Sequence, residues 1–216
     1  MIHRLSLVLA AIGGAFVVVV VAYIVFVSLD AAPGDAFFNP TRAMEPTLLV
    51  GERFTVRMID QVRGVEIRRG ELVMHAWPVD RSKRFVKRIV GLPGDTLAMV
   101  GGILRVNGSV VTEPYAWHEE SAVDPASDEF RWQRAHLVGP AARDSAQYSP
   151  SRNNWGPILV PPGMYFVLGD NRDNSLDSRY WGFLPGEDVL AEVRRVYFSR
   201  DSTGHIRWSR LGRRAR

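Results

Sequence analysis

Three segments combine residue types that could carry out hydrolysis. They are a Pro- and Thr-containing turn at residues 40–48, an apolar strand pattern at residues 84–95, and a Gly/Asp/Asn/Ser run at residues 169–182. A hydroxyl becomes a nucleophile only when a base removes its proton. Lysine can be that base if burial lowers its pKa from about 10.4. Lys87 suits this role because Phe85, Val86 and Ile89 make its strand apolar.

The composition excludes several other chemistries. The 216 residues contain no cysteine, which rules out a thiol nucleophile, a zinc ribbon, an iron–sulfur site and a disulfide scaffold. The five histidines show no metal-binding spacing such as H-E-x-x-H, and neither a P-loop nor a G-x-S-x-G elbow occurs. We therefore expect no metal and no organic cofactor, and we expect no nucleic-acid partner.

The elements that position these segments are predicted to be mainly β. Short apolar runs bounded by Gly, Pro, Asn and Asp predict strands. The predicted strands are residues 53–58, 71–77, 84–90, 96–100, 103–106, 110–111, 164–168, 190–198 and 205–208. Gly101-Gly102 and Asn107-Gly108 predict hairpin turns, because both turn positions must tolerate positive φ.

The N-terminal segment predicts a membrane anchor. Residues 5–29 carry no charge, and 25 helical residues would rise about 37 Å, enough to cross a hydrocarbon core of about 30 Å. A cleaved signal peptide is the alternative, but its apolar core would span only about 7–15 residues. Arg4 before the span and Asp30 after it place residues 1–4 in the cytoplasm. We expect a single-pass protein of the cell membrane, in contact with the lipid bilayer, whose body lies on the extracytoplasmic (periplasmic) face.

After the anchor we expect a β body with an insertion. Residues 36–111 and 163–200 form the predicted catalytic body, and residues 112–162, which are acidic and then turn-rich, form an inserted second domain. Residues 201–216 form a basic tail with five arginines. We interpret the tail as solvated, and contact with anionic lipid headgroups is the alternative.

Together and in this order, these segments resemble the bacterial type I signal peptidases, which cleave signal peptides from exported pre-proteins with a serine/lysine dyad. The resemblance runs from the anchor to about Val193, and the run from Gly169 to Gly182 is its most specific part. It also includes Arg69-Gly70-Glu71-Leu72-Val73, which is similar to the family's R-G-D-x-V strand. The resemblance implies an all-β catalytic body with a smaller inserted domain. The implied partners are signal peptides with small residues at −1 and −3, and we expect a monomer.

The resemblance assigns roles to matching positions. Lys87 would be the general base, Thr41 would supply the oxyanion-hole hydroxyl, and Ser175 would orient the lysine. Asp177 and Arg179 match a supporting ion pair. The turn that shapes the site corresponds to Asp170, Asn171 and Arg172. The predicted substrate-binding residues are Pro40, Met44, Phe85, Val86 and Ile89.

The nucleophile position departs from the family pattern. The family motif S-x-S-M-x-P-T reads here Thr41-Arg42-Ala43-Met44-Glu45-Pro46-Thr47. Alanine has no hydroxyl and cannot form an acyl-enzyme, and Thr41 would lie a full pleat from the base. We therefore expect the chain as written not to hydrolyse a signal peptide. Either Ala43 is an introduced change in a working peptidase, or the chain is a natural pseudo-peptidase that binds signal peptides or secretion partners without cleavage.

Two neighbouring interpretations use related motifs. Self-cleaving serine/lysine repressors share parts of this β body, but they need a DNA-binding helical domain where this chain has the predicted anchor. A conjugation-type processing peptidase stays open within the family.

Overall fold

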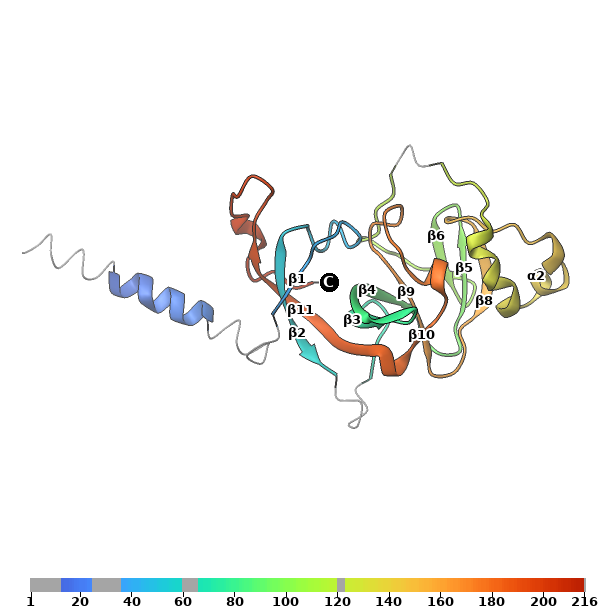
Figure 1. The fold of residues 1–216 in the computed structure, drawn as a ribbon, viewed down its shortest axis with the longest axis horizontal. Helices are drawn as coiled ribbons and strands as arrows, with labels where there is room; N and C mark the ends of the chain where they lie inside the picture. Colours follow the sequence, from blue (N-terminus) through green and yellow to red (C-terminus); the bar gives the residue numbers. More distant parts are fainter. Residues whose placement is uncertain (1–12, 25–35, 60–65, 120–122, 216) are drawn as a thin grey trace, which may run out of the picture.

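The computed structural model describes residues 13–24, 36–59, 66–119 and 123–215. Two antiparallel sheets form its body (Figure 1). The seven-stranded sheet has the order β1-β2-β11-β3-β4-β9-β10, and the four-stranded sheet has the order β7-β6-β5-β8. The predicted mainly β fold is therefore confirmed.

The large sheet consists of β1 (Ala36–Phe38), β2 (Glu52–Met58), β3 (Leu72–Trp77), β4 (Asp80–Gly91), β9 (Met164–Leu168), β10 (Leu184–Pro185) and β11 (Val189–Ser199). The small sheet consists of β5 (Thr96–Val100), β6 (Ile103–Val106), β7 (Ser109–Val110) and β8 (Trp155–Leu159). Short helices lie between the strands: η2 (Asp128–His136), α2 (Pro140–Arg143), η3 (Ser145–Gln147), α3 (Ser178–Trp181) and η4 (Gly186–Asp188). Another short helix, η5 (Trp208–Arg210), follows the last strand.

The hairpin of β3 and β4 defines the two faces of the large sheet. Val73 pairs with Lys87, and His75 pairs with Phe85. Opposed residues of antiparallel strands point to the same face, and neighbours along one strand point to opposite faces. Lys87, Phe85 and His75 therefore share one face, whereas Arg88 points to the other.

Each face of the large sheet buries its own apolar cluster. The cluster on the Lys87 face contains Ile67, Val73, Ile89, Val167, Leu184 and Val189. The cluster on the Arg88 face includes Met44, Leu48, Phe54, Val56, Leu72, Met74, Ala191 and Val193. Because both faces are covered at the buried end of β4, residues 87–91, a polar side chain there must find its partners inside the protein.

The small sheet forms from local hairpins. Gly101, Gly102, Asn107 and Gly108 make its turns with φ values of 57°, 79°, 52° and 81°. These turns join β5, β6 and β7, and β8 completes the sheet by pairing with β5. The structure thus groups residues 96–110 with β8, whereas the sequence interpretation placed them in the catalytic body and began the insertion at residue 112. Strands joined by two-residue turns pair with each other, so β5, β6 and β7 belong to one sheet.

The C-terminal tail differs from its prediction. The strand predicted at residues 205–208 is wrong, since Ile206 forms only an isolated bridge with Arg200 and Trp208 begins η5. The tail then returns along β11, where the Gly212 amide donates to the Val196 carbonyl at 2.8 Å. Arg210 is buried, so the interpretation of a solvated tail is wrong for this residue.

Part of the predicted anchor is visible. Residues 13–24 are helical, and residues 5–12 and 25–29 lie outside the described residues. Within the described part of the chain, no helix combines the length and the apolar character needed to cross a bilayer.

Candidate active site

Lys87 is a buried cation on β4. It is 4% exposed, and burial lowers the pKa of its ammonium to about 8 against the opposing attraction of Asp177. Its Nζ lies 5.4 Å from the centroid of the Phe85 ring. A buried lysine with a pKa near neutral can exist as a free amine, which is the form that accepts a proton.

Position 43 meets the Gly169–Gly182 run directly after β9. The Ala43 carbonyl accepts a hydrogen bond from the Asn171 amide at 3.1 Å. A Cβ on Gly169 would lie 2.2 Å from the Ser175 Oγ and 2.6 Å from the Ala43 carbonyl oxygen. Both contacts are too close for any side chain, so glycine is required here for Ser175 and Ala43 to approach each other.

Asp177 and Arg179 form the centre of that run. Both are fully buried, and Arg179 donates from Nε and Nη2 to the two Asp177 carboxylate oxygens at 2.8 Å each. The carboxylate also accepts the Gly169 amide at 3.0 Å, and Arg179 donates to the Arg172 carbonyl at 2.7 Å. Burial opposes ionisation of Asp177, but the adjacent guanidinium outweighs it and lowers the pKa of this carboxyl. The run is therefore a self-bonded polar turn that fixes its own backbone.

Asp170 connects this turn to β4 and to residues 43–48. Arg88 donates to both Asp170 carboxylate oxygens, at 2.8 and 2.6 Å. The Thr47 hydroxyl donates to the same carboxylate at 2.5 Å. All three side chains are buried. Asp170 thus ties together three segments that are distant in the sequence.

The predicted site residues separate into two groups. Ala43, Ser175, Asp170, Asn171 and Asp177 lie on connected turns. Within the described residues, the buried Ser175 Oγ has no hydrogen-bond partner.

The other group consists of predicted substrate-binding residues and Thr41. Thr41 and Pro40 are exposed. Met44 is 1% exposed in the cluster on the Arg88 face, and the half-buried Val86 packs against that cluster. Ile89 is 0% exposed and lies in the opposite cluster, on the Lys87 face of the sheet.

Sequence reasoning missed two features of the site. His75 is fully buried beside Phe85 and Trp181, with ring centroids 6.2 and 5.7 Å away, and burial lowers its pKa to about 4. The sequence signal for this burial is the place of His75 in an apolar strand. The second feature is the buried pair of Glu52 and Arg210, for which the sequence carries no local signal.

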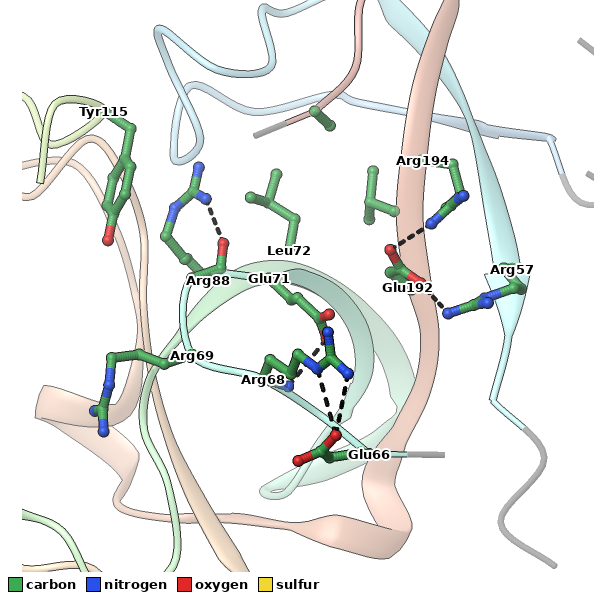
Figure 2. Close-up of a pocket in the computed structure, with 13 residues that line it drawn as sticks. Arg57, Glu66, Arg68, Arg69, Glu71, Leu72, Arg88, Tyr115, Glu192 and Arg194 are labelled. Atoms are coloured by element: carbon green, nitrogen blue, oxygen red, sulfur yellow. Dashed lines mark hydrogen bonds and ion pairs between the residues drawn. The ribbon is translucent and has the colours of Figure 1, made fainter. Parts of the chain in front are cut away.

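One cavity lies beside Leu72 and Arg88, and Lys87 is not among its lining residues (Figure 2). It has a volume of about 730 Å³ and is lined by Arg57, Glu66, Arg68, Arg69, Gly70, Glu71, Leu72, Arg88, Tyr115, Glu192, Val193, Arg194 and Ala215. Its charges pair with one another, as in the contacts of Glu192 with Arg57 and Arg194. Among the described residues, no cluster of three or more His, Asp or Glu side chains could hold a metal ion.

The family model and the related sequences agree on one family. Residues 9–198 match the family model described as "Signal peptidase, peptidase S26". A probable signal peptidase I-2 from Synechocystis sp. is 34% identical over 181 residues, covering 81% of this chain and 67% of that protein. The signal peptidase I of Bacillus licheniformis is 31% identical and covers 83% and 85% of the two chains. A solved signal peptidase I from Enterococcus faecalis V583 has 28% identity and a TM-score of 0.39, covering 59% and 96%.

Proposed function

The chain belongs to the signal peptidase family, peptidase S26, and from this premise we propose that it is a signal peptidase whose site lacks only its nucleophile. The family is one of serine endopeptidases that remove signal peptides. In this chain Ala43 occupies the position of the serine. The site binds a signal peptide, and hydrolysis requires a hydroxyl at position 43.

The observation that carries this proposal is the buried Lys87 with a pKa of about 8. In an Ala43→Ser chain, the neutral amine of Lys87 takes the proton from the serine Oγ, which attacks the scissile carbonyl. The lysine ammonium then returns the proton to the leaving amine, and water hydrolyses the acyl-enzyme in a second step. Thr41 and the backbone amide of position 43 would stabilise the oxyanion, and Ser175 would orient the lysine.

The proposed location is the membrane surface, with the body on the extracytoplasmic face. Residues 5–29 carry no charge, and the helical residues 13–24 expose apolar side chains such as Phe16 and Val18, which are 68% and 67% exposed. Such a segment favours lipid as its surroundings. The apolar part of a signal peptide would lie in the same membrane, next to the site.

The proposal is tested by cleavage of a pre-protein by the full chain and by its Ala43→Ser variant. We expect no turnover by the chain as written and turnover by the Ala43→Ser variant. The kcat/KM of that variant should rise with pH through about 8, because only the neutral Lys87 amine accepts the proton. Equal turnover by both chains, or turnover by an Ala43→Ser/Lys87→Met chain at the rate of Ala43→Ser, would refute the mechanism.

A second function, binding without cleavage, is favoured by the methyl group at position 43. The chain would then hold signal peptides or secretion partners as a non-catalytic module. Binding of a fluorescent signal peptide to vesicles carrying the full chain separates the two functions. Tight binding with no turnover even after Ala43→Ser would support the binding module, whereas turnover would support the peptidase.

A further inference from the structure

The C-terminal tail returns to the large sheet and reaches the candidate active site. β3 pairs with β11 only through Val189–Glu192, which leaves the same edge of β11 open further along. The tail fills this edge: the Val196 amide donates to the Arg213 carbonyl at 2.9 Å, and the Ala215 amide donates to the Arg194 carbonyl at 3.0 Å.

This path buries Arg210 against Glu52 at the start of β2. The guanidinium donates from Nε and Nη2 to the two carboxylate oxygens at 2.6 and 2.8 Å, a bidentate geometry. Glu52 is 0% exposed, and it also accepts the Leu49 amide and the Ser199 hydroxyl at 2.9 Å each. A buried ion pair is weak evidence for stability, because its desolvation opposes its Coulomb attraction. Its directional bonds do fix the relative position of the segments that carry it.

One of those segments carries position 43. Nη2 of Arg210 also donates to the Thr47 carbonyl at 2.7 Å. The hydroxyl of the same Thr47 donates to Asp170, and the neighbouring Asn171 amide donates to the Ala43 carbonyl. The turn formed by residues 43–48 is therefore held by the Gly169–Gly182 run on one side and by the C-terminal tail on the other.

We propose that Arg210 and Glu52 are positioning residues, which hold the 43–48 turn in register with Lys87. This inference rests on the proposed function for its catalytic consequence, but the fixing of the turn is independent of catalysis. The hydrogen bonds of the Arg210 guanidinium go to Glu52 and to the Thr47 carbonyl. It acts through Thr47, whose two polar groups bind Arg210 and Asp170.

The first test measures hydrogen exchange in the full chain as it exists, comparing Arg210→Met with the unaltered protein. Arg213→Met is the matched control, because Arg213 lies in the same tail with an exposed side chain. In Arg210→Met we expect exchange at the Leu48 and Leu49 amides to become faster by about tenfold or more, because a local opening becomes easier. Exchange in β5, β6 and β8 should be unchanged. If Arg210→Met does not fold, Glu52→Gln serves as the milder variant.

The second test measures cleavage in the Ala43→Ser background. In this background we expect Arg210→Met to lower kcat by about 100-fold with little change in KM, because it displaces the nucleophile and misplacement by about 1 Å has effects of this size. Arg210→Lys should recover part of the loss, because one ammonium can replace only some of the three donated bonds.

Two results of the exchange experiment would overturn the inference: unchanged exchange in the 43–48 turn, or faster exchange spread equally over both sheets. An unchanged kcat despite a loosened turn would also overturn it. If Ala43→Ser itself is inactive, the proposed function fails, and the exchange experiment still decides whether the tail fixes the turn.

Discussion

Lys87 and Arg88 are neighbours on β4, but they lie on opposite faces of the sheet and their buried cations have different surroundings. Arg88 is 1% exposed and donates two bonds to Asp170 and one to the Gly70 carbonyl at 2.6 Å. Its ring neighbour is Tyr115, with the centroid 3.7 Å from the guanidinium carbon. Lys87 is 4% exposed, and the aromatic contact that the structure gives it is the Phe85 ring.

The difference separates a buried cation that has a carboxylate partner from one whose charge is destabilised by burial. The carboxylate partner and the hydrogen bonds of Arg88 replace the water that its guanidinium has lost. Lys87 has its charge destabilised by the same degree of burial, which lowers its pKa to about 8. Sheet register alone assigns these two environments, because adjacent residues of a strand face opposite sides.

Breaking the ion pair of Arg88 and Asp170 should have the largest effect on stability. Arg88→Met leaves the buried Asp170 carboxylate without its main partner, and we expect it to destabilise the protein by about 3–5 kcal/mol. Chemical denaturation at pH 7 measures this change. The double variant Arg88→Met/Asp170→Asn should lose less than Arg88→Met alone, because no unpaired charge remains. A loss below about 1 kcal/mol for Arg88→Met would contradict the comparison.

Removing the Lys87 cation should change the free energy of unfolding in the opposite direction. In the unfolded chain Lys87 keeps its proton up to about pH 10.4, and in the folded chain up to about pH 8. The folded state is therefore penalised below pH 8, and stability rises as pH increases from 8 to about 10.4. Lys87→Met should stabilise the protein at pH 7 by up to about 3 kcal/mol, with a smaller gain at pH 10.

The control for this variant is Lys83→Met on the same strand, where the side chain is 59% exposed. It should leave the denaturation midpoint unchanged. A Lys87→Met protein that is less stable than the unaltered chain at pH 7 would mean that Lys87 is held by favourable contacts rather than destabilised by burial.

His75 offers a third, smaller effect on the Lys87 face. Burial lowers its pKa to about 4, so between about pH 6.5 and 4 the unfolded chain binds a proton that the folded chain does not. Stability then falls as pH decreases through this range, by about 2 kcal/mol at pH 5. His75→Phe should remove this part of the acid sensitivity, as measured by denaturation at pH 7.5 and pH 5. An identical pH dependence in both proteins would show that His75 does not titrate in this way.

The smallest effect is expected at an exposed pair. Arg42 and Glu45 lie 2.9 Å apart beside position 43, but the Arg42 side chain is 66% exposed. Solvent screens such a pair, so Arg42→Ala should leave the thermal midpoint unchanged. A clear drop would mean that ion pairing without burial contributes to holding the 43–48 turn.

The parts of the fold that could be predicted depend on neighbours in sequence. The strands at residues 96–100, 103–106 and 164–168 match their predicted limits, and two-residue turns define the first two. The division between the sheets could not be predicted in the same way. It depends on β8, which pairs with β5 across an intervening stretch that contains η2, α2 and η3.

The candidate site shows the same limit. Lys87 could be identified from its apolar strand. The sequence did not show on which face of the large sheet each of the predicted substrate-binding residues would lie. Ile89 was expected near the substrate, but β9 and Val189 bury it in the cluster on the Lys87 face. Arg210 was expected in water, because its partner Glu52 is 158 residues away in the chain.

The sequence by itself determined that position 43 has no hydroxyl, that Lys87 lies in an apolar strand, and that two hairpin turns follow it. The first property is covalent, and the other two depend on neighbours in the sequence. The tertiary structure alone decided which buried cations are paired. The environment of a buried cation depends on the carboxylates that the fold brings near it from distant segments. Asp170 pairs with Arg88, and Glu52 pairs with Arg210 of the tail beside the 43–48 turn. Burial of Lys87 instead lowers the pKa of its ammonium.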